Sequence, residues 1–341
     1  MKIHILLASV IVSYSNIIYA QLPSAAIVSP IQMGAYMPGI INPRDYANPE
    51  TSGLIAMDYN IFFDSDEYVD RHGNKVDNLD IGIGFDPVPI EVDMSGYLNA
   101  LAIVYVSPEL SFFGKARYLA FISPYYSTMD YRVALSELIV GDTAVTGSTG
   151  GFGDLSIAPI YLTWAGENQK WDVTAGYMFS APTGRYETGA DDNIGLGYWN
   201  HILQVFAYYY PLPEKATAIF LGNSFEFHSK IKDADVRPGN RYTIDYGISQ
   251  YLSERFEITI QGGNTWQIRE DSGDDVYWDT SFKDRYSTIG VGLGFWPVKQ
   301  KFYTHLKWWT NYGIRQHFKT NNIQLQLIYI PGILMAKADK N

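Results

Sequence analysis

Residues that could perform acid–base or nucleophilic chemistry are few in this sequence, and their spacing matches no catalytic motif. Cysteine is absent, which removes thiolate nucleophiles and thiolate metal sites. No G-x-S-x-G segment occurs, and Ser148, between Gly147 and Gly150, does not fit one. His228 and Ser229 are adjacent in an extended segment, so their side chains face opposite sides. A lipid hydrolase needs a nucleophile, a base and an orienting group in contact, and the sequence therefore predicts no catalytic residue and no cofactor. The six histidines are His4, His72, His201, His228, His305 and His317.

Two acidic segments, residues 64–80 and 269–284, raise the question of a metal site. Clustered carboxylates could hold Ca²⁺ or Mg²⁺, but neither segment has the D-x-[DN]-x-[DN]-G spacing of a calcium loop. We therefore favour a solvated acidic surface and expect no metal site. The net charge of −11 also argues against nucleic-acid binding, which requires a basic surface. The acidic residues are Asp64, Asp66, Glu67, Asp70, Asp77, Asp80, Glu270, Asp271, Asp274, Asp275, Asp279 and Asp284.

A set of charged residues falls on one face of successive extended segments. If the apolar face contacts lipid, the charged face lines a lumen. Charges of both signs could pair and seal a narrow lumen, or they could line a polar path, and the sequence leaves both possibilities open. Gly290, Gly292 and Gly294 leave part of the same face bare, either for close packing or strand curvature, which we favour, or for a plug or substrate. The predicted lumen-lining residues are Lys115, Arg117, Asp154, Asp172, Glu226, Arg241, Asp245, Glu257 and Lys307.

Alternation of apolar and polar residues dominates the chain from residue 52 to residue 330. A period of two places successive side chains on opposite faces of a strand. We therefore predict an all-β fold, a transmembrane antiparallel β-barrel of about 12 strands. The segment Ile81–Met94 is either a thirteenth strand or structure within a long loop. The predicted strands are 52–63, 97–106, 111–125, 152–164, 170–180, 197–210, 216–229, 240–250, 256–267, 285–297, 302–311 and 320–330.

The predicted connections alternate between short and long. In outer-membrane barrels the short turns face the periplasm and the long loops face the outside. Both termini are therefore predicted to lie in the periplasm. The short connections are 107–110, 165–169, 211–215, 251–255 and 298–301, and the long ones are 64–96, 126–151, 181–196, 230–239, 268–284 and a shorter stretch near 312–319.

Aromatic residues gather at the strand ends beside the short turns. Trp164 and Trp171 flank one turn, Tyr251 and Phe256 flank another, and residues 208–210 are three tyrosines before a third. Rings of this kind settle at the membrane interface. A soluble β-sandwich also alternates, but the aromatic ends, the loop pattern and an export signal together favour the membrane barrel.

The first twenty residues have the pattern of a secretory signal peptide. Lys2 supplies a positive start, residues 5–12 form an apolar core, and Ala20 fits a cleavage site. The core is too short to span a bilayer. Residues 21–51 carry prolines, which remove strand hydrogen-bond donors. This segment is either a periplasmic lead-in, which we favour, or a plug inside the lumen. Its prolines are Pro23, Pro30, Pro38, Pro43 and Pro49.

Five short motifs occur in order between residues 151 and 199. They are Gly151-Phe152-Gly153-Asp154-Leu155, Ala158-Pro159, Trp171-Asp172, Ala181-Pro182-Thr183-Gly184-Arg185-Tyr186 and Asn193-Ile194-Gly195-Leu196-Gly197-Tyr198-Trp199. With them the chain resembles the outer-membrane family named for a meta-pathway of phenol degradation. The resemblance implies a barrel related to transporters encoded near genes of aromatic catabolism. One departure is the C-terminus, where Tyr329 is followed by a C-terminal extension, residues 331–341, instead of ending the last strand.

Together these patterns predict four segments: a signal peptide (1–20), the proline-rich segment (21–51), the barrel (52–330) and the extension (331–341). The partners expected are outer-membrane lipid, the barrel-assembly machinery and a small-molecule solute. The resemblance implies uptake of small aromatic or hydrophobic molecules by passive or gated diffusion. The alternative is a non-transporting surface barrel that binds a partner or scaffolds the envelope, with a lipid hydrolase as a remote third.

Overall fold

The computed structural model describes residues 29, 34–79, 88–135, 143–166, 168–188, 190 and 192–331. The predicted signal peptide and the chain after residue 331 lie outside the described residues. No helix in the described part of the chain is long and apolar enough to cross a membrane.

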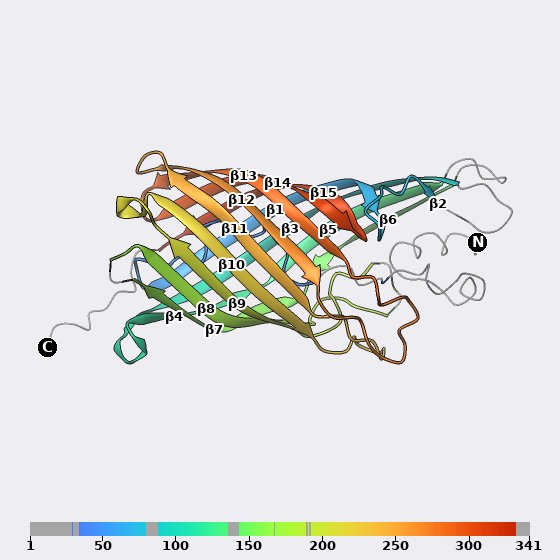
Figure 1. Cartoon of the computed structure of the whole chain (residues 1–341), viewed down its shortest axis with the longest axis horizontal. Coiled ribbons are helices and arrows are strands. Elements are labelled where there is room, and N and C mark those ends of the chain that lie inside the picture. Colours follow the sequence, from blue (N-terminus) through green and yellow to red (C-terminus); the bar gives the residue numbers. More distant parts are fainter. Residues whose placement is uncertain are drawn as a thin grey trace.

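Twelve of the described strands close into an antiparallel barrel (Figure 1). The ring closes because β1 pairs with β3 on one side and with β15 on the other. Period-two alternation and the apolar outer face predicted this closed barrel, and the prediction is confirmed. The ring consists of β1 (Gly53–Val69), β3 (Val88–Leu110), β4 (Ala116–Ser123), β7 (Leu155–Ala165), β8 (Trp171–Ala181), β9 (Asn200–Tyr209), β10 (Thr217–His228), β11 (Arg241–Tyr251), β12 (Phe256–Gln267), β13 (Arg285–Val298), β14 (Phe302–Arg315) and β15 (His317–Tyr329).

Three further strands extend the wall on the side of the long connections. They are β2 (Asn78–Leu79), β5 (Tyr125–Leu135) and β6 (Thr143–Phe152), and β5 pairs with the first half of β3 and with β6. Pro124 separates β4 from β5, because proline has no N–H for the ladder. The loop predicted at 126–151 is therefore largely strand.

The segment Ile81–Met94 is not a separate thirteenth strand where it is described. Its residues 88–94 begin β3, and residues 81–87 lie outside the described part of the chain. At the other end β3 continues through the turn predicted at 107–110 and leads into a short 3₁₀-helix, η2 (Ser111–Phe113). A second such turn, η3 (Pro213–Lys215), precedes β10. Strand pairing continues past the alternating apolar run, and the sequence pattern alone does not show how far.

The outer face is a band of exposed apolar side chains, which include Leu203, Leu293 and Leu325. In a bilayer this band contacts lipid, while the closed ladder satisfies the backbone hydrogen bonds. Of the three tyrosines at 208–210, Tyr209 is 52% exposed, whereas Tyr208 and Tyr210 are 2% and 1% exposed and face the lumen. The prediction that all three mark the interface is wrong for two of them, because neighbouring residues of a strand must point in opposite directions.

A polar patch on β1 and β3 interrupts the apolar band. Asn99 Nδ2 donates to Asp58 Oδ1 at 2.6 Å, and the Tyr97 hydroxyl donates to Asn60 Oδ1 at 2.6 Å. The register places Asp58 opposite Leu101 and Leu327 on the outer face. The patch satisfies its own hydrogen bonds, which lowers the cost of placing these groups beside lipid.

Glycines on the inner face lie beneath aromatic rings of the neighbouring strand. A Cβ atom at Gly290 would lie 2.6 Å from Trp309 Cβ, and one at Gly292 would lie 2.4 Å from the His305 ring. A Cβ at Gly294 would meet the Tyr303 side chain. Close packing therefore accounts for the bare face that these three glycines leave.

Candidate functional site

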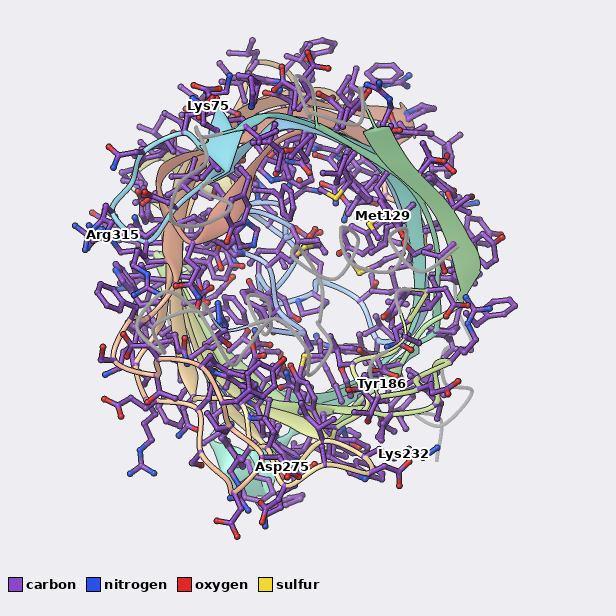
Figure 2. All side chains as sticks on the ribbon, turned by 90° about the vertical axis from the view of Figure 1, so that its right-hand side faces the viewer. Lys75, Met129, Tyr186, Lys232, Asp275 and Arg315 are labelled. Carbon is purple, nitrogen blue, oxygen red and sulfur yellow. The ribbon has the colours of Figure 1, made fainter. Side chains whose placement is uncertain are left out.

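Residues 34–50, here called the lumen segment, lie inside the ring of strands. In the view along the barrel, part of the blue trace crosses the interior (Figure 2). The lumen segment contacts inward-facing side chains of strands that are far away in the sequence. The lead-in that the sequence favoured is therefore wrong for these residues. Proline spacing excludes a central strand but does not reveal which wall side chains will bind the segment.

Lys307 binds the backbone of the lumen segment most directly. Its Nζ donates to the carbonyl oxygens of Gly39, Ile40 and Ile41 at 2.6, 3.2 and 3.1 Å. Only 1% of Lys307 is exposed. A buried ammonium group is stable only when its three donors are used. The three carbonyls meet this need and fix the turn at residues 39–41.

Three glutamines of the wall also donate hydrogen bonds to oxygen atoms of the lumen segment. Gln261 Nε2 donates to the carbonyl oxygens of Gly39 and Ile41 at 3.0 and 2.9 Å. Gln324 Nε2 donates to the Ile40 carbonyl at 2.9 Å, and Gln326 Nε2 donates to Asp45 Oδ1 at 2.9 Å. The sequence analysis missed these residues because it considered only charged groups on the inner face. Their alternation with apolar residues in β12 and β15 was the signal that could have found them.

Wall carboxylates accept the N–H and O–H groups of the lumen segment. Asp245 accepts from the Tyr36 hydroxyl at 2.7 Å and from Gly39 N–H at 2.8 Å. Glu226 accepts from Ala35 N–H at 2.8 Å. Hydrogen bonds to an ionised acceptor are stronger than neutral ones. Acids of the wall therefore bind donors of the segment, while Lys307 and the glutamines bind its acceptors.

The lumen segment also carries charged side chains of its own. Arg44 Nε lies 2.7 Å from Glu257 Oε1 and donates to Ser249. Asp45 Oδ2 accepts from Tyr59 of β1 at 2.9 Å. Burial raises the pKa of Asp45, against the opposing effect of hydrogen bonds from Gln326 and from the backbone of Asn42. Burial therefore outweighs these hydrogen bonds at this carboxyl group.

The structure divides the nine predicted lumen residues into several roles. Asp172, Glu226, Asp245, Glu257 and Lys307 all hold the lumen segment. Of the others, Arg241 forms a buried pair with Asp284 at one end of the barrel, and Arg117 lies 3.7 Å from Glu109 at the other. Lys115 is exposed in the turn before β4, and its assignment to the lumen is wrong because that strand begins only at Ala116.

Asp154 joins the sequence motifs found between residues 151 and 199. Its carboxylate accepts from Gly184 N–H at 3.0 Å and from Leu196 N–H at 2.8 Å. A Cβ at Gly195 would lie 2.7 Å from Asp154 Oδ1, so this approach requires glycine. Burial raises the pKa of Asp154, while the hydrogen bonds from the backbone of Leu196 and Gly184 oppose that rise. The motifs that contain Asp154, Gly184 and Leu196 thus order the connection between β8 and β9.

The inner faces of β1, β3, β4 and β5, here called the apolar wall, differ from the inner faces of β8 to β15, here called the polar wall. Ala102, Val104 and Val106 form an inner cluster with Met57 and Phe121. Further along the same wall, on the side of the long connections, inward-facing side chains are half-buried. They are Leu98, Met94 and Met129, and Figure 2 shows Met129 on the inner side of the ring.

The histidines and acidic loops form other contacts. His201 is hydrogen-bonded to Tyr177, and His305 is hydrogen-bonded to Thr259. His228 is hydrogen-bonded to Glu226 and to the Pro238 carbonyl. Within the described residues, no group of three or more His, Asp or Glu side chains is placed to hold a metal ion. In the acidic loops Arg71 pairs with Asp279, and Trp278 donates to Asp271.

A closed antiparallel ring with an apolar outer band defines the class of outer-membrane β-barrels. The chain belongs to the family described as "Putative MetA-pathway of phenol degradation", whose model matches residues 66–327. No curated protein matches the sequence.

The chain is similar to several solved structures. The COG4313 outer membrane channel from Pseudomonas putida F1 has a TM-score of 0.63 at 17% identity, over 85% of this chain and 99% of that one. The transport unit of the autotransporter AIDA-I from Escherichia coli has a TM-score of 0.48 at 13% identity, over 84% and 92% of the two chains. The NanC porin has a TM-score of 0.43 at 8% identity, over 80% and 99%. At these identities the likeness concerns the fold.

Proposed function

We propose that the protein is a channel of the bacterial outer membrane that takes up small apolar or aromatic molecules by gated diffusion. The division of its inner surface carries the proposal. Lys307, Asp245 and Gln324 of the polar wall bind the lumen segment through buried hydrogen bonds, whereas the apolar wall keeps half-buried side chains such as Leu98 and Met129 on the lumen side. Polar solutes gain little free energy from contact with such a surface. Apolar solutes are stabilised along it, because the contact reduces their exposure to water.

The lumen segment is the gate in this proposal. Its contacts with Lys307, Asp245 and Gln324 hold it in the middle of the barrel. Toward the short turns, the apolar wall has no surface accessible to a solute at Val104 and Val106, which are 8% and 0% exposed. Passage along the whole wall therefore requires part of the lumen segment to move. No residue is assigned a catalytic role.

A reversible tether tests both the channel and the gate. The chain has no cysteine, so a Gly39→Cys/Thr288→Cys variant introduces a single pair. A Cβ at Gly39 would lie 3.6 Å from Thr288 Cβ, within the range of a disulfide. The φ of +83° at Gly39 disfavours any side chain there by about 1–2 kcal/mol. This cost is small enough for the folded barrel to accept.

The measurement is uptake of a small aromatic solute by liposomes containing the variant, before and after reduction. We expect the oxidised form to be closed and the reduced form to conduct like the wild type. Equal uptake in both redox states would contradict the gate. Absence of uptake by the wild type and by the reduced variant would contradict the channel and favour the non-transporting surface barrel. Thr288→Cys alone controls for the effect of the reductant.

A further inference from the structure

Tyr46 of the lumen segment fills a slot lined by aromatic rings of the wall. Its ring stacks on Phe206, with the centroids 4.0 Å apart and the planes inclined by 13°. Its centroid lies 5.5 Å from that of Tyr161, which in turn stacks with Phe121 at 6.0 Å. Phe206 and Tyr161 are 0% and 1% exposed. Tyr46 is thus the one ring of this group that the lumen segment brings to the wall.

Two glycines give the slot its shape. A Cβ at Gly176 would lie 2.3 Å from the Tyr161 ring, and a Cβ at Gly222 would lie 2.7 Å from the Phe206 ring. Without these Cβ atoms the two rings cover the backbone of the neighbouring strand. They leave space for a third ring on their lumen side, which Tyr46 fills.

The slot also has a polar end that suits a phenolic hydroxyl group. The Tyr161 hydroxyl donates to Gln204 Oε1 at 2.5 Å, and Gln204 Nε2 donates to Ser224 Oγ at 2.7 Å. Because Tyr161 gives its single proton to Gln204, its hydroxyl oxygen can still accept a hydrogen bond from a second hydroxyl group. The slot therefore offers a stacking surface in Phe206 and a hydrogen-bond acceptor in the hydroxyl oxygen of Tyr161.

We propose that this slot is a binding site for a phenolic ring, and that Tyr46 occupies it as an internal ligand in the closed state. The proposal rests on the channel function proposed above and names the chemical class of one solute. A free phenol reproduces the ring and the hydroxyl group of Tyr46. Its binding releases the Tyr46 side chain, which leaves the backbone of that residue held by Tyr208 and Thr174.

Binding of p-cresol, which is the side chain of tyrosine as a free molecule, tests the slot. In Tyr46→Ala the slot is empty, and we expect p-cresol to bind at least 10-fold more tightly than to the wild type. We also expect p-cresol to restore the melting temperature that the substitution lowers. The saturated analogue 4-methylcyclohexanol, which cannot stack, is the ligand control. Isothermal titration and thermal unfolding of the detergent-solubilised protein measure both effects without any assumption about transport.

Two double variants separate the contribution of the stacking surface to p-cresol binding from that of the Tyr161 hydroxyl group. Tyr46→Ala/Phe206→Ala removes the stacking surface and should abolish the gain in p-cresol affinity. Tyr46→Ala/Tyr161→Phe removes the hydroxyl partner and should make the protein bind toluene and p-cresol equally. Equal binding of p-cresol to Tyr46→Ala and to Tyr46→Ala/Phe206→Ala would overturn the site.

The internal-ligand role is tested on the wild type, which avoids any variant that fails to fold. In planar bilayers we expect p-cresol to raise the conductance of the wild type and to leave that of Tyr46→Ala, which should already be high, unchanged. An unchanged wild-type conductance with p-cresol would overturn the displacement of Tyr46. The channel itself is judged separately by the tethering experiment, in which a closed oxidised form and an open reduced form would support it whatever p-cresol does.

Discussion

The polar wall and the apolar wall have the same alternating strand pattern, but their inward-facing side chains differ in polarity. On the polar wall, Lys307, Gln324 and Asp245 bind the backbone of the lumen segment. On the apolar wall, Val104 and Leu98 offer no strong hydrogen-bonding group to a peptide. A wall of buried polar groups requires partners, and the lumen segment supplies them. Five of the predicted lumen charges therefore hold a peptide segment in place.

The largest effect is expected from Lys307→Met on the polar wall. The substitution leaves the carbonyl groups of Gly39, Ile40 and Ile41 with fewer donors. We expect the free energy of unfolding to fall by about 3 kcal/mol, since buried acceptors lose a charged partner. Urea unfolding in liposomes, followed by tryptophan fluorescence, measures it, and limited proteolysis reports whether residues 34–50 become accessible.

The matched control is Lys299→Met. Lys299 lies 2.8 Å from Glu254, and both side chains are largely exposed. Its loss should change the free energy of unfolding by less than about 1 kcal/mol. If the two lysine variants were equally stable, the lumen segment would not depend on the polar wall, and the contrast between the walls would lose its energetic basis.

An intermediate effect is expected on the apolar wall from Leu98→Ser. The substitution places a hydroxyl group on the inner face opposite Ser127 of β5. We expect uptake of apolar solutes to fall about 5-fold, which corresponds to about 1 kcal/mol of lost transfer free energy along the path. Proteolysis of residues 34–50 should stay as in the wild type. Initial uptake rates in proteoliposomes measure the change.

Ser127→Ala is the neighbouring control, because it changes the same region in the opposite sense. It should leave uptake unchanged or slightly raised. A similar decrease in both variants, or a Leu98→Ser variant with wild-type uptake, would show that solutes do not follow the apolar wall.

The smallest effect is expected on the outside of the same wall, at the polar patch of β1 and β3. Asp58→Leu removes a carboxyl group between Leu101 and Leu327. We expect stability in the bilayer to rise by about 1 kcal/mol at most, since a polar group beside lipid is costly. Uptake should not change, because the substituted side chain faces away from the lumen. Lower stability of Asp58→Leu would indicate that the patch is needed to hold β1 against β3.

Period-two alternation determined the barrel, and the structure confirms the twelve strands that it predicted. The same alternation placed Asp172, Asp245 and Lys307 on the inner face, where they are buried. It failed for Lys115, because the turn after β3 lies further along the chain than the apolar pattern suggested. A strand ends where its partner ends, and the partner is not visible in a local pattern.

Local periodicity is sufficient to predict the wall, because each side chain of a strand can point to only two faces. The contents of the lumen depend on contacts between distant parts of the chain. The contacts of Lys307 with residues 39–41 and of Tyr46 with Phe206 join positions that are more than 150 residues apart. Neither contact leaves a periodic trace in the sequence. They arise because the closed ring brings distant strands around one segment, whose polar groups and aromatic ring then find their partners on the inner face.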